Sequence, residues 1–433
     1  MASASSSRDP WPVPSGRPVS GQAAVPGSKS WTHRAYARAF LAEAPVRVVG
    51  ALRAEDTDLF LKALEQCGFR VRCERTEVWL EPPKVWPRAA SFFCGNAGTL
   101  LRLLLGLVAT RPGLWHFDGT ERLRQRPVGP LLAALGALGI EVRYWGTLGS
   151  VPLEIESRGL QGGAVRLSAV ESSQYLSALL FAGQAAAGAL SIAVDGLSSE
   201  PYVAMTEAAI RDGGGSVFRE GPNRWRTEPA RICGGTVWVE ADCSAAAYPA
   251  AAAAVTGGEI LIAQVPAESF QGDRKFLDLL SSLGAEVETV PEGVRVRGRS
   301  LVGGEVDLNG MPDQVPTLAA VAPFASGVTR IRNVAHLRLK ESDRLAVTRR
   351  ELTRVGVPAR ELPDGLEIPG IWSGGVPKLP PVVIDPEGDH RIAMAFAVLG
   401  LRRGGVAIAH PEVVEKSFPS FFEELEQWTA GRG

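Results

Sequence analysis

Cations, hydroxyl groups and amides recur at regular intervals along this 433-residue chain, each time directly before an Ala- or Leu-rich stretch. The six polar groups are Ser28-Lys29-Ser30, Asn96-Ala97-Gly98-Thr99, Ser172-Ser173-Gln174, Asp242-Cys243-Ser244, Pro312-Asp313-Gln314 and Gly388-Asp389-His390-Arg391. Where a helix begins, its first backbone N–H groups have no partner within the helix and carry about half a positive charge. Six such helix starts aimed at one place would bind an anion, so the pattern predicts an anion site.

The densest polar segment is His336-Leu337-Arg338-Leu339-Lys340-Glu341-Ser342-Asp343-Arg344. Lys340 and Arg344 are four positions apart, so on a helix they would share a face and could bind one anion, with Glu341 beside them to carry a proton. A surface helix with many ion pairs would have a similar composition. The segment therefore needs support from the rest of the chain.

Further cations accompany the other polar groups. Arg34 follows the first group by about one turn, and Arg102 interrupts an otherwise apolar helix, where an unpaired charge would be costly. Arg126 lies in an arginine-rich loop, whereas Arg391 and Lys416 each stand at an expected helix start. Taken singly, each could be a solvated cation or part of a helix cap. Their recurrence in nearly every repeat favours an anion site over chance.

The elements that position these residues form a long repeat. The polar groups begin at positions 28, 96, 172, 242, 312 and 388, so each repeat has 68 to 76 residues and is a whole subdomain. A strand-like apolar run follows each group, then a helix ending in glycine, then a hairpin such as residues 285–290 with 293–297. The last repeat ends at Trp428 without a hairpin, while residues 11–26 offer strands. We expect this N-terminal segment to complete the sixth repeat.

The repeats predict an α/β fold of two similar domains, each with three β-α-β-α-β-β units. Ala-rich runs at residues 185–187, 245–247 and 250–254 suit close helix packing, so parallel helices are expected inside and sheets outside. The first domain is expected at residues 27–240, and the second, discontinuous domain at 1–26 with 241–433. Chain crossings near Pro26 and Ala241 would form a hinge, and the inner helix starts would face the cleft between the domains.

The composition limits the other classes of function. With 45% hydrophobic residues and a formal net charge of -1, the chain has no general attraction to nucleic acid or to an anionic membrane. Its five cysteines form no C-x-x-C pair, so neither a metal site nor a disulfide framework is expected. No stretch reaches the roughly 20 apolar residues of a membrane span, and the N-terminus lacks the core of a secretion signal. We expect a cytoplasmic monomer.

Nine phrases of the sequence, in order between residues 17 and 422, resemble the 5-enolpyruvylshikimate-3-phosphate synthase family. They are PGSKSWTHR, GNAGTLLR, RQRPVG, ESSQYLSALL, SSEPY, MPDQVPTLA, HLRLKESDRL, GDHRIAMAF and EKSFPSFF. The resemblance implies the enolpyruvyl transferase fold. It also implies transfer of the enolpyruvyl group of phosphoenolpyruvate to the 5-hydroxyl of shikimate 3-phosphate, with release of phosphate and without metal or cofactor. This reaction belongs to the shikimate pathway of aromatic amino acid biosynthesis and is inhibited by glyphosate in the phosphoenolpyruvate pocket.

The resemblance also implies site residues. The shikimate 3-phosphate ligands would be Lys29, Ser30, Arg34, Ser172, Ser173, Gln174, Ser199, Tyr202, Asp313, His336 and Lys340. The phosphoenolpyruvate ligands would be Lys29, Asn96, Gly98, Arg126, Gln174, Arg344, Arg391 and Lys416. Asp313 would be the base that takes the proton of the attacking hydroxyl. Glu341 and Lys29 would manage protons at the enolpyruvyl methylene and the leaving phosphate.

Two positions depart from the family pattern. His336 stands where many relatives have Asn, which would make a hydrogen bond to substrate sensitive to pH. Leu103 follows Arg102 where relatives often have Pro, which bears on the setting of that helix and of Gly98.

Two other functions fit parts of the pattern. A UDP-N-acetylglucosamine enolpyruvyl transferase uses the same donor, but that family has a reactive cysteine in the loop that here runs from Arg122 to Pro127, and this loop has none. A non-catalytic binder of phosphorylated ligands would also need cations. The carboxylates of Asp313 and Glu341 argue against it, because they would repel an anionic ligand.

Overall fold

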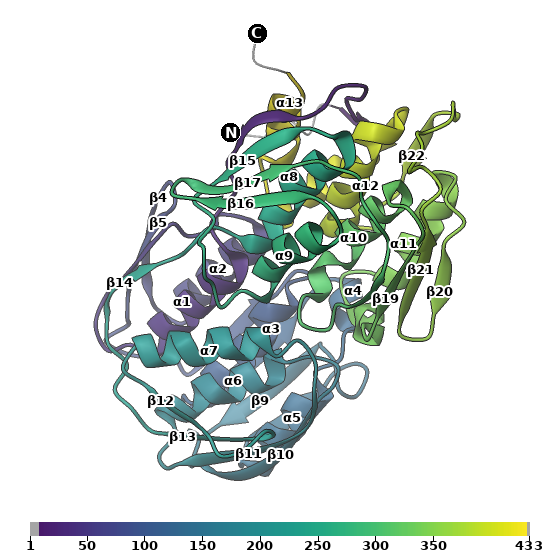
Figure 1. Ribbon diagram of the computed structural model, residues 1–433. Coiled ribbons are helices and arrows are strands. Elements are labelled where there is room, and N and C mark those ends of the chain that lie inside the picture. Colours follow the sequence, from purple (N-terminus) through teal and green to yellow (C-terminus); the bar gives the residue numbers. More distant parts are fainter. Residues whose placement is uncertain (1–7, 431–433) are drawn as a thin grey trace. The chain divides into compact units, whose positions relative to one another are not determined.

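The computed structural model describes residues 8–430 of the chain (Figure 1). These residues form two compact units. The central unit runs from Gly27 to Val239, and the terminal unit combines the residues up to Pro26 with those from Glu240 onward. The chain therefore passes from one unit to the other twice, and the terminal unit is built from two separate segments.

In its described residues, the central unit contains three four-stranded sheets, with strand orders β14-β3-β5-β4, β6-β7-β9-β8 and β10-β11-β13-β12. The first two strands of each sheet are parallel, and the other neighbours are antiparallel. The strands are β3 (Val46–Val49), β4 (Arg70–Glu74), β5 (Glu77–Glu81), β6 (Ala89–Phe93), β7 (Gly113–Asp118), β8 (Glu141–Tyr144), β9 (Leu153–Ser157), β10 (Gly163–Ala169), β11 (Leu190–Leu197), β12 (Ser216–Arg219), β13 (Arg224–Glu228) and β14 (Gly235–Trp238).

The helices of the central unit are of two kinds. The inner helices are α1 (Lys29–Leu41), α3 (Gly98–Ala109) and α6 (Gln174–Ala182), and the others are α2 (Glu55–Gln66), α4 (Glu121–Arg124), α5 (Gly129–Ala137) and α7 (Pro201–Asp212), with the short 3-10 helix η2 (Gly183–Ala185). The inner helices are buried almost throughout, and α3 packs against α1 and α6. Gly106 allows this approach, because a Cβ there would lie 2.6 Å from the carbonyl oxygen of Ala178.

The terminal unit follows the same plan, with described sheets in the orders β16-β17-β15-β2, β18-β19-β21-β20 and β1-β23-β22. Its strands are β1 (Trp11–Pro12), β2 (Ser20–Ala23), β15 (Glu259–Ala263), β16 (Glu286–Val290), β17 (Gly293–Arg297), β18 (Glu305–Asp307), β19 (Val328–Arg332), β20 (Arg360–Leu362), β21 (Gly365–Pro369), β22 (Val382–Ile384) and β23 (Val406–Ile408). Its helices are α8 (Cys243–Thr256), α9 (Lys275–Ser282), α10 (Val315–Val321), α11 (Arg344–Arg354), α12 (His390–Arg403) and α13 (Phe421–Ala430), with the 3-10 helices η3 (Gly272–Arg274), η4 (Pro312–Gln314), η5 (Ala322–Phe324), η6 (Ala335–Leu339) and η7 (Pro411–Lys416).

Helices α8, α10 and α12 are the inner helices of the terminal unit. They pack on one another and are buried on nearly every side, while strands such as β15 and β17 run over α8 (Figure 1). A helix buried all round needs apolar residues on every face, which the Ala-rich sequence of α8 supplies. The predicted α/β fold of β-α-β-α-β-β units, with helices inside and sheets outside, is thus confirmed.

The prediction that the N-terminal segment completes the sixth repeat was only partly right. Trp11 and Pro12 do pair with β23, but Ser20–Ala23 pairs in parallel with β15, in the sheet of the fourth repeat. The reason is that the chain changes unit directly after β2. Strand β2 belongs to the terminal unit, whereas the next helix, α1, belongs to the central unit. In the same way β14 stays in the central unit and pairs with β3, although it precedes α8 of the terminal unit.

Among the described residues, no helix is both long enough and apolar enough to cross a membrane.

Candidate active site

The polar groups predicted to open helices do so in both units. Ser28 caps α1, α3 begins at Gly98, and α6 begins at Gln174. Asp242 caps α8 and Asp389 caps α12, each by accepting a hydrogen bond from a backbone N–H. The remaining group forms the turn η4 directly before α10. Backbone N–H groups at such starts can bind anions.

Lys29, the first residue of α1, forms an ion pair with a carboxylate that the sequence analysis did not single out. Its Nζ lies 3.3 Å from Oδ2 of Asp56 on α2, and Asp56 is buried. His33 lies one turn further along, with its Nδ1 3.0 Å from the carbonyl oxygen of Lys29. Burial lowers the pKa of His33 to about 4, so its ring adds no charge near neutral pH. Asp56 therefore holds the ammonium at the helix start.

Arg34 is buried and ties α1 to α7. Its Nη1 donates to the carbonyl oxygen of Ser30 at 2.9 Å and its Nη2 to that of Tyr202 at 2.6 Å. Its Nε donates to Oγ1 of Thr206 at 3.0 Å. Burial lowers the pKa of Arg34 to about 10, so the side chain remains a cation. The structure thus brings three predicted site residues together, with Arg34 fixing the other two.

Three predicted serines are also buried in the central unit. Ser172 and Ser173 stand directly before α6, and Oγ of Ser172 accepts a hydrogen bond from the backbone N–H of Gln174. Ser199 has a left-handed backbone with a φ of +56°, which is uncommon for a residue other than glycine. Backbone strain of this kind is found at functional sites. Its carbonyl oxygen accepts from the N–H of Tyr202 at 3.1 Å.

Arg102 lies buried in the apolar helix α3 and is bound by polar groups. Its Nη1 donates to Oε1 of Gln174 at 2.7 Å, and its Nη2 donates to the carbonyl oxygen of Pro127 at 3.1 Å. The amide of Gln174 in turn donates to Oγ1 of Thr99 at 2.9 Å. The next residue, Leu103, is buried in the regular part of α3. Arg102 therefore fixes the amide that was predicted to contact both substrates.

Arg126 and Gly98 form one cluster at the start of α3. Nη1 of Arg126 donates to the carbonyl oxygen of Asn96 at 2.9 Å and lies 3.3 Å from Oδ1 of the same residue. Gly98 has no side chain, and the Arg126 guanidinium occupies the space that a Cβ would need. The structure thus brings together Asn96, Gly98 and Arg126, all predicted to bind phosphoenolpyruvate.

Arg344 is the centre of the polar residues in the terminal unit. Its Nη1 donates to Oδ1 of Asp313 at 2.7 Å, its Nη2 to Oε2 of Glu341 at 2.8 Å, and its Nε to Oδ2 of Asp389 at 2.7 Å. The Arg344 side chain is 2% exposed. Burial would lower the pKa of Arg344, but Asp389, Glu341 and Asp313 outweigh burial and raise it. One guanidinium thus holds three carboxylates.

Asp313 is bound from two sides. Besides Arg344, it pairs with Arg391, whose Nη2 lies 2.6 Å from Oδ2 of Asp313. Burial by itself would raise the pKa of Asp313, but Arg391 and Arg344 outweigh burial and hold this pKa well below its usual value. Nη1 of Arg391 also lies 3.5 Å from the hydroxyl oxygen of Tyr248, and burial raises the pKa of Tyr248 to about 12.

Two predictions of local structure were wrong. Lys340 and Arg344 do not share a helix face, because α11 begins only at Arg344. The side chain of Asp343 caps α11 by accepting a hydrogen bond from the N–H of Ala346, which sets the helix start there. Lys416 does not open a helix either, but is the buried last residue of η7.

His336 lies buried on η6. Burial, reinforced by the charge of Lys340, lowers the pKa of His336 to about 3. The ring is therefore neutral near physiological pH. The effect of His336 on the pH dependence of substrate binding stays a prediction.

The sequence did not reveal the ion pairs of two carboxylates, Asp56 with Lys29 and Asp389 with Arg344. Asp56 gave no signal of its own, because an acidic residue in the first turn of a helix is common. Asp389 was recognised only as part of a helix start. Its second role, holding Arg344, depends on a contact between residues 45 positions apart.

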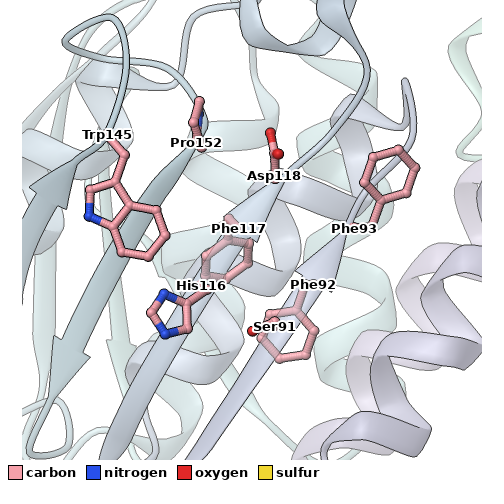
Figure 2. A pocket seen from close by; sticks show the side chains of 8 residues that line it. All are labelled: Ser91, Phe92, Phe93, His116, Phe117, Asp118, Trp145 and Pro152. Atoms are coloured by element: carbon pink, nitrogen blue, oxygen red, sulfur yellow. The ribbon is translucent and has the colours of Figure 1, made fainter.

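A separate pocket of about 350 Å³ lies over strands β6 and β7 (Figure 2). It is lined by Ser91, Phe92, Phe93, His116, Phe117, Asp118, Trp145 and Pro152, none of which was predicted as a site residue. Its carboxylate is paired, since Asp118 lies 2.7 Å from Nη2 of Arg124, and Nδ1 of His116 lies 2.9 Å from Oε2 of Glu154. The pocket is thus distinct from both clusters of predicted residues.

Comparisons with known proteins agree on one family. The model of EPSP synthase (3-phosphoshikimate 1-carboxyvinyltransferase) matches residues 13–425. A 3-phosphoshikimate 1-carboxyvinyltransferase from Syntrophobacter fumaroxidans is 48% identical over 418 residues, which covers 95% of this chain and 98% of the relative. The structure of EPSP synthase from Acinetobacter baumannii matches with a TM-score of 0.81 and 28% identity, over 98% of each chain.

A more distant structure shares the fold. The enolpyruvyl transferase NikO from Streptomyces tendae matches with a TM-score of 0.77 at 18% identity, over 96% of each chain. The family match, the relative that is 48% identical and the shared fold all extend over nearly the whole sequence. The chain therefore belongs to the EPSP synthase family and is an enzyme of that family.

Proposed function

We propose that this chain transfers the enolpyruvyl group of phosphoenolpyruvate to the 5-hydroxyl of shikimate 3-phosphate and releases phosphate, as a step of the shikimate pathway. One observation supports this function over simple anion binding: two carboxylates, Asp313 and Glu341, lie on the buried guanidinium of Arg344. A receptor for anions gains nothing from carboxylates at that place, whereas an enzyme that moves protons needs them.

The proposed ligands of shikimate 3-phosphate combine cations with hydroxyl and amide groups. They are Lys29, Ser30, Arg34, Ser172, Ser173, Gln174, Ser199, Tyr202, Asp313, His336 and Lys340. A sugar-like ring with hydroxyls and one phosphate needs such a mixture. The contacts of Arg34 with Ser30 and Tyr202 support the assignment, because these residues form one preorganised group.

The proposed ligands of phosphoenolpyruvate are mostly cations. They are Lys29, Asn96, Gly98, Arg126, Gln174, Arg344, Arg391 and Lys416. Arg126, Arg344, Arg391 and Lys416 are all buried, which strengthens their attraction for a carboxylate or a phosphate. Arginine suits this role because its planar fork can make two hydrogen bonds to one anion.

The proposed reaction is an addition followed by an elimination. In the addition, Asp313 takes the proton of the 5-hydroxyl, the hydroxyl oxygen bonds to C2 of phosphoenolpyruvate, and C3 gains a proton to become a methyl group. In the elimination, the bond between C2 and the phosphate oxygen breaks and one methyl proton leaves, which restores the double bond. Glu341 and Lys29 would serve the proton transfers at C3 and at the leaving phosphate.

We further propose that the enzyme acts as a cytoplasmic monomer without metal or cofactor, and that the two passages of the chain near Pro26 and Ala241 act as a hinge. Each unit has its own core, and the chain passes between the units only twice, so such movement would leave both cores intact.

An assay of phosphate release tests the proposed function. The enzyme is mixed with phosphoenolpyruvate and shikimate 3-phosphate, and phosphate is measured over time. Release is expected only when both compounds are present. A parallel assay replaces shikimate 3-phosphate by UDP-N-acetylglucosamine.

Phosphate release from phosphoenolpyruvate with UDP-N-acetylglucosamine, but not with shikimate 3-phosphate, would assign the chain to the other enolpyruvyl transferase activity. Binding of both compounds without phosphate release would instead indicate a non-catalytic binder. Either result would contradict the proposal.

A further inference from the structure

The three carboxylates on Arg344 are not held equally. Asp389 is fully buried and makes further bonds, since its Oδ2 accepts from Oγ of Ser342 at 3.1 Å and its Oδ1 from the N–H of Arg391 at 3.0 Å. The side chain of Asp313 is 23% exposed and that of Glu341 is 10% exposed. Asp389 therefore anchors the Nε edge of the guanidinium, while the two Nη groups face carboxylates that are more accessible.

The accessible carboxylates are also the two proposed proton carriers. Both oxygens of Asp313 accept from guanidinium groups, one from Arg344 and one from Arg391. A carboxylate neutralised in this way is a weak base, because its proton affinity is low. The same two arginines are proposed to bind phosphoenolpyruvate. Substrate and proton carriers thus compete for the same N–H groups.

We propose that an anionic substrate replaces Asp313 and Glu341 on Arg344 and Arg391, so that these two carboxylates become effective proton carriers only after the substrate has bound. The inference rests on the proposed function and adds an order of events to it. Asp389 keeps the Arg344 guanidinium in place during the exchange. The two arginines stay paired with negative charge throughout, because the substrate anion takes the place of the two carboxylates.

The released carboxylate stays among other charged and titratable groups. Those that face Asp313 are Arg344 from α11, Arg391 from α12, Tyr248 from α8, His336 from η6, and Lys340 and Glu341 from the segment between η6 and α11. His336 and Tyr248 are neutral near pH 7 because of their shifted pKa values, about 3 and about 12. Once its arginine partners bind substrate, they lower the pKa of Asp313 less and burial opposes them more fully, so this pKa rises from its depressed value.

Proton uptake on binding tests this exchange. Phosphoenolpyruvate alone is titrated into the enzyme by calorimetry at about pH 5, in two buffers with different ionisation enthalpies, which counts the protons bound per site. Wild type should take up more protons than Asp313→Asn or Glu341→Gln. Ionisation of the substrate itself is common to all proteins and cancels in the difference. Glu387→Gln is the matched control, because Glu387 pairs with Arg350 outside this group and should leave uptake unchanged.

Equal uptake by wild type and by both carboxamide variants, with phosphoenolpyruvate still bound, would overturn the inference. A second measurement needs no variant. The kcat of the wild type is measured at decreasing pH down to about pH 4, and its decrease at acid pH reports the pKa values of groups in the enzyme–substrate complex. We expect kcat to fall over this range. A kcat that does not change with pH would show that the two carboxylates stay paired with the arginines in the complex. Phosphate release near pH 7 in the same preparation would show that the proposed function stands even then.

Discussion

Gly98 and Arg126 occupy adjoining space so closely that a Cβ on Gly98 would lie 2.6 Å from Nη2 of Arg126. The same Cβ would lie 3.0 Å from Nη1 of Arg102. Both guanidinium groups have fixed partners, Arg126 on Asn96 and Arg102 on Gln174. A methyl group at position 98 must therefore displace the end of at least one arginine.

This contact leads to a prediction for Gly98→Ala. We expect the displaced guanidinium to narrow the proposed phosphoenolpyruvate pocket, so that glyphosate, which is longer than the substrate, loses affinity by at least about tenfold more than phosphoenolpyruvate does. Steady-state inhibition against phosphoenolpyruvate, with shikimate 3-phosphate saturating, measures both constants. Gly136→Ala is the control, since a Cβ there meets nothing within 4 Å. Equal losses for inhibitor and substrate would count against this pocket shape.

The proposed proton carriers lead to a second prediction. Asp313→Asn and Glu341→Gln should each lower kcat by roughly 10²- to 10⁴-fold, because positioned acid and base groups contribute that much. Their effect on KM should be much smaller. Lys29→Met should damage both constants, since Lys29 is assigned to both substrates. Near wild-type turnover in either carboxamide variant would show that the proton roles are assigned to the wrong residues.

The packing of the inner helices α3 and α6 leads to a third prediction. Gly106→Ala would place a Cβ 2.6 Å from the backbone oxygen of Ala178, which cannot rotate away. We expect a loss of roughly 1–3 kcal/mol in the free energy of unfolding from overpacking. Thermal denaturation measures the melting temperatures of Gly106→Ala and of the control Gly136→Ala. The control should be as stable as the wild type or slightly more stable, because alanine favours a helix. Equal melting temperatures for the two variants would contradict the close packing of α3 and α6.

Buried histidines predict how stability depends on pH. The pKa of His33 falls from 6.5 to about 4 on folding, so between these values the unfolded chain binds a proton that the native protein does not. Stability should therefore decrease as the pH falls from about 6.5 towards 4, by up to ~3 kcal/mol from this group. His33→Gln should show a shallower decrease in melting temperature over this window. A variant with the same slope as wild type would exclude His33 as a source of acid sensitivity.

Sequence reasoning worked best where local pattern decides local structure. Alternation over residues 285–297 predicted the hairpin of β16 and β17, and the Ala-rich run after Asp242 predicted a buried helix. It failed where one residue shifts a boundary, as Asp343 does by starting α11 four residues after Lys340. It also could not find Asp56 or the second role of Asp389, because both depend on contacts distant in sequence. The same limit hid the pairing of β2 with β15, which joins residues about 240 positions apart.

The pairing of β1 with β23 and of β2 with β15 also sets the order in which the protein can fold as it is synthesised. Every strand of the central unit lies between Val46 and Trp238, so that unit can form its sheets before the rest of the chain has been made. Strands β1 and β2 leave the ribosome before the central unit does, but they must wait for partners that follow much later, near Ile408 and Glu259. Until then their edges are open to wrong pairing, so binding of a chaperone to residues 11–23 would protect the nascent chain.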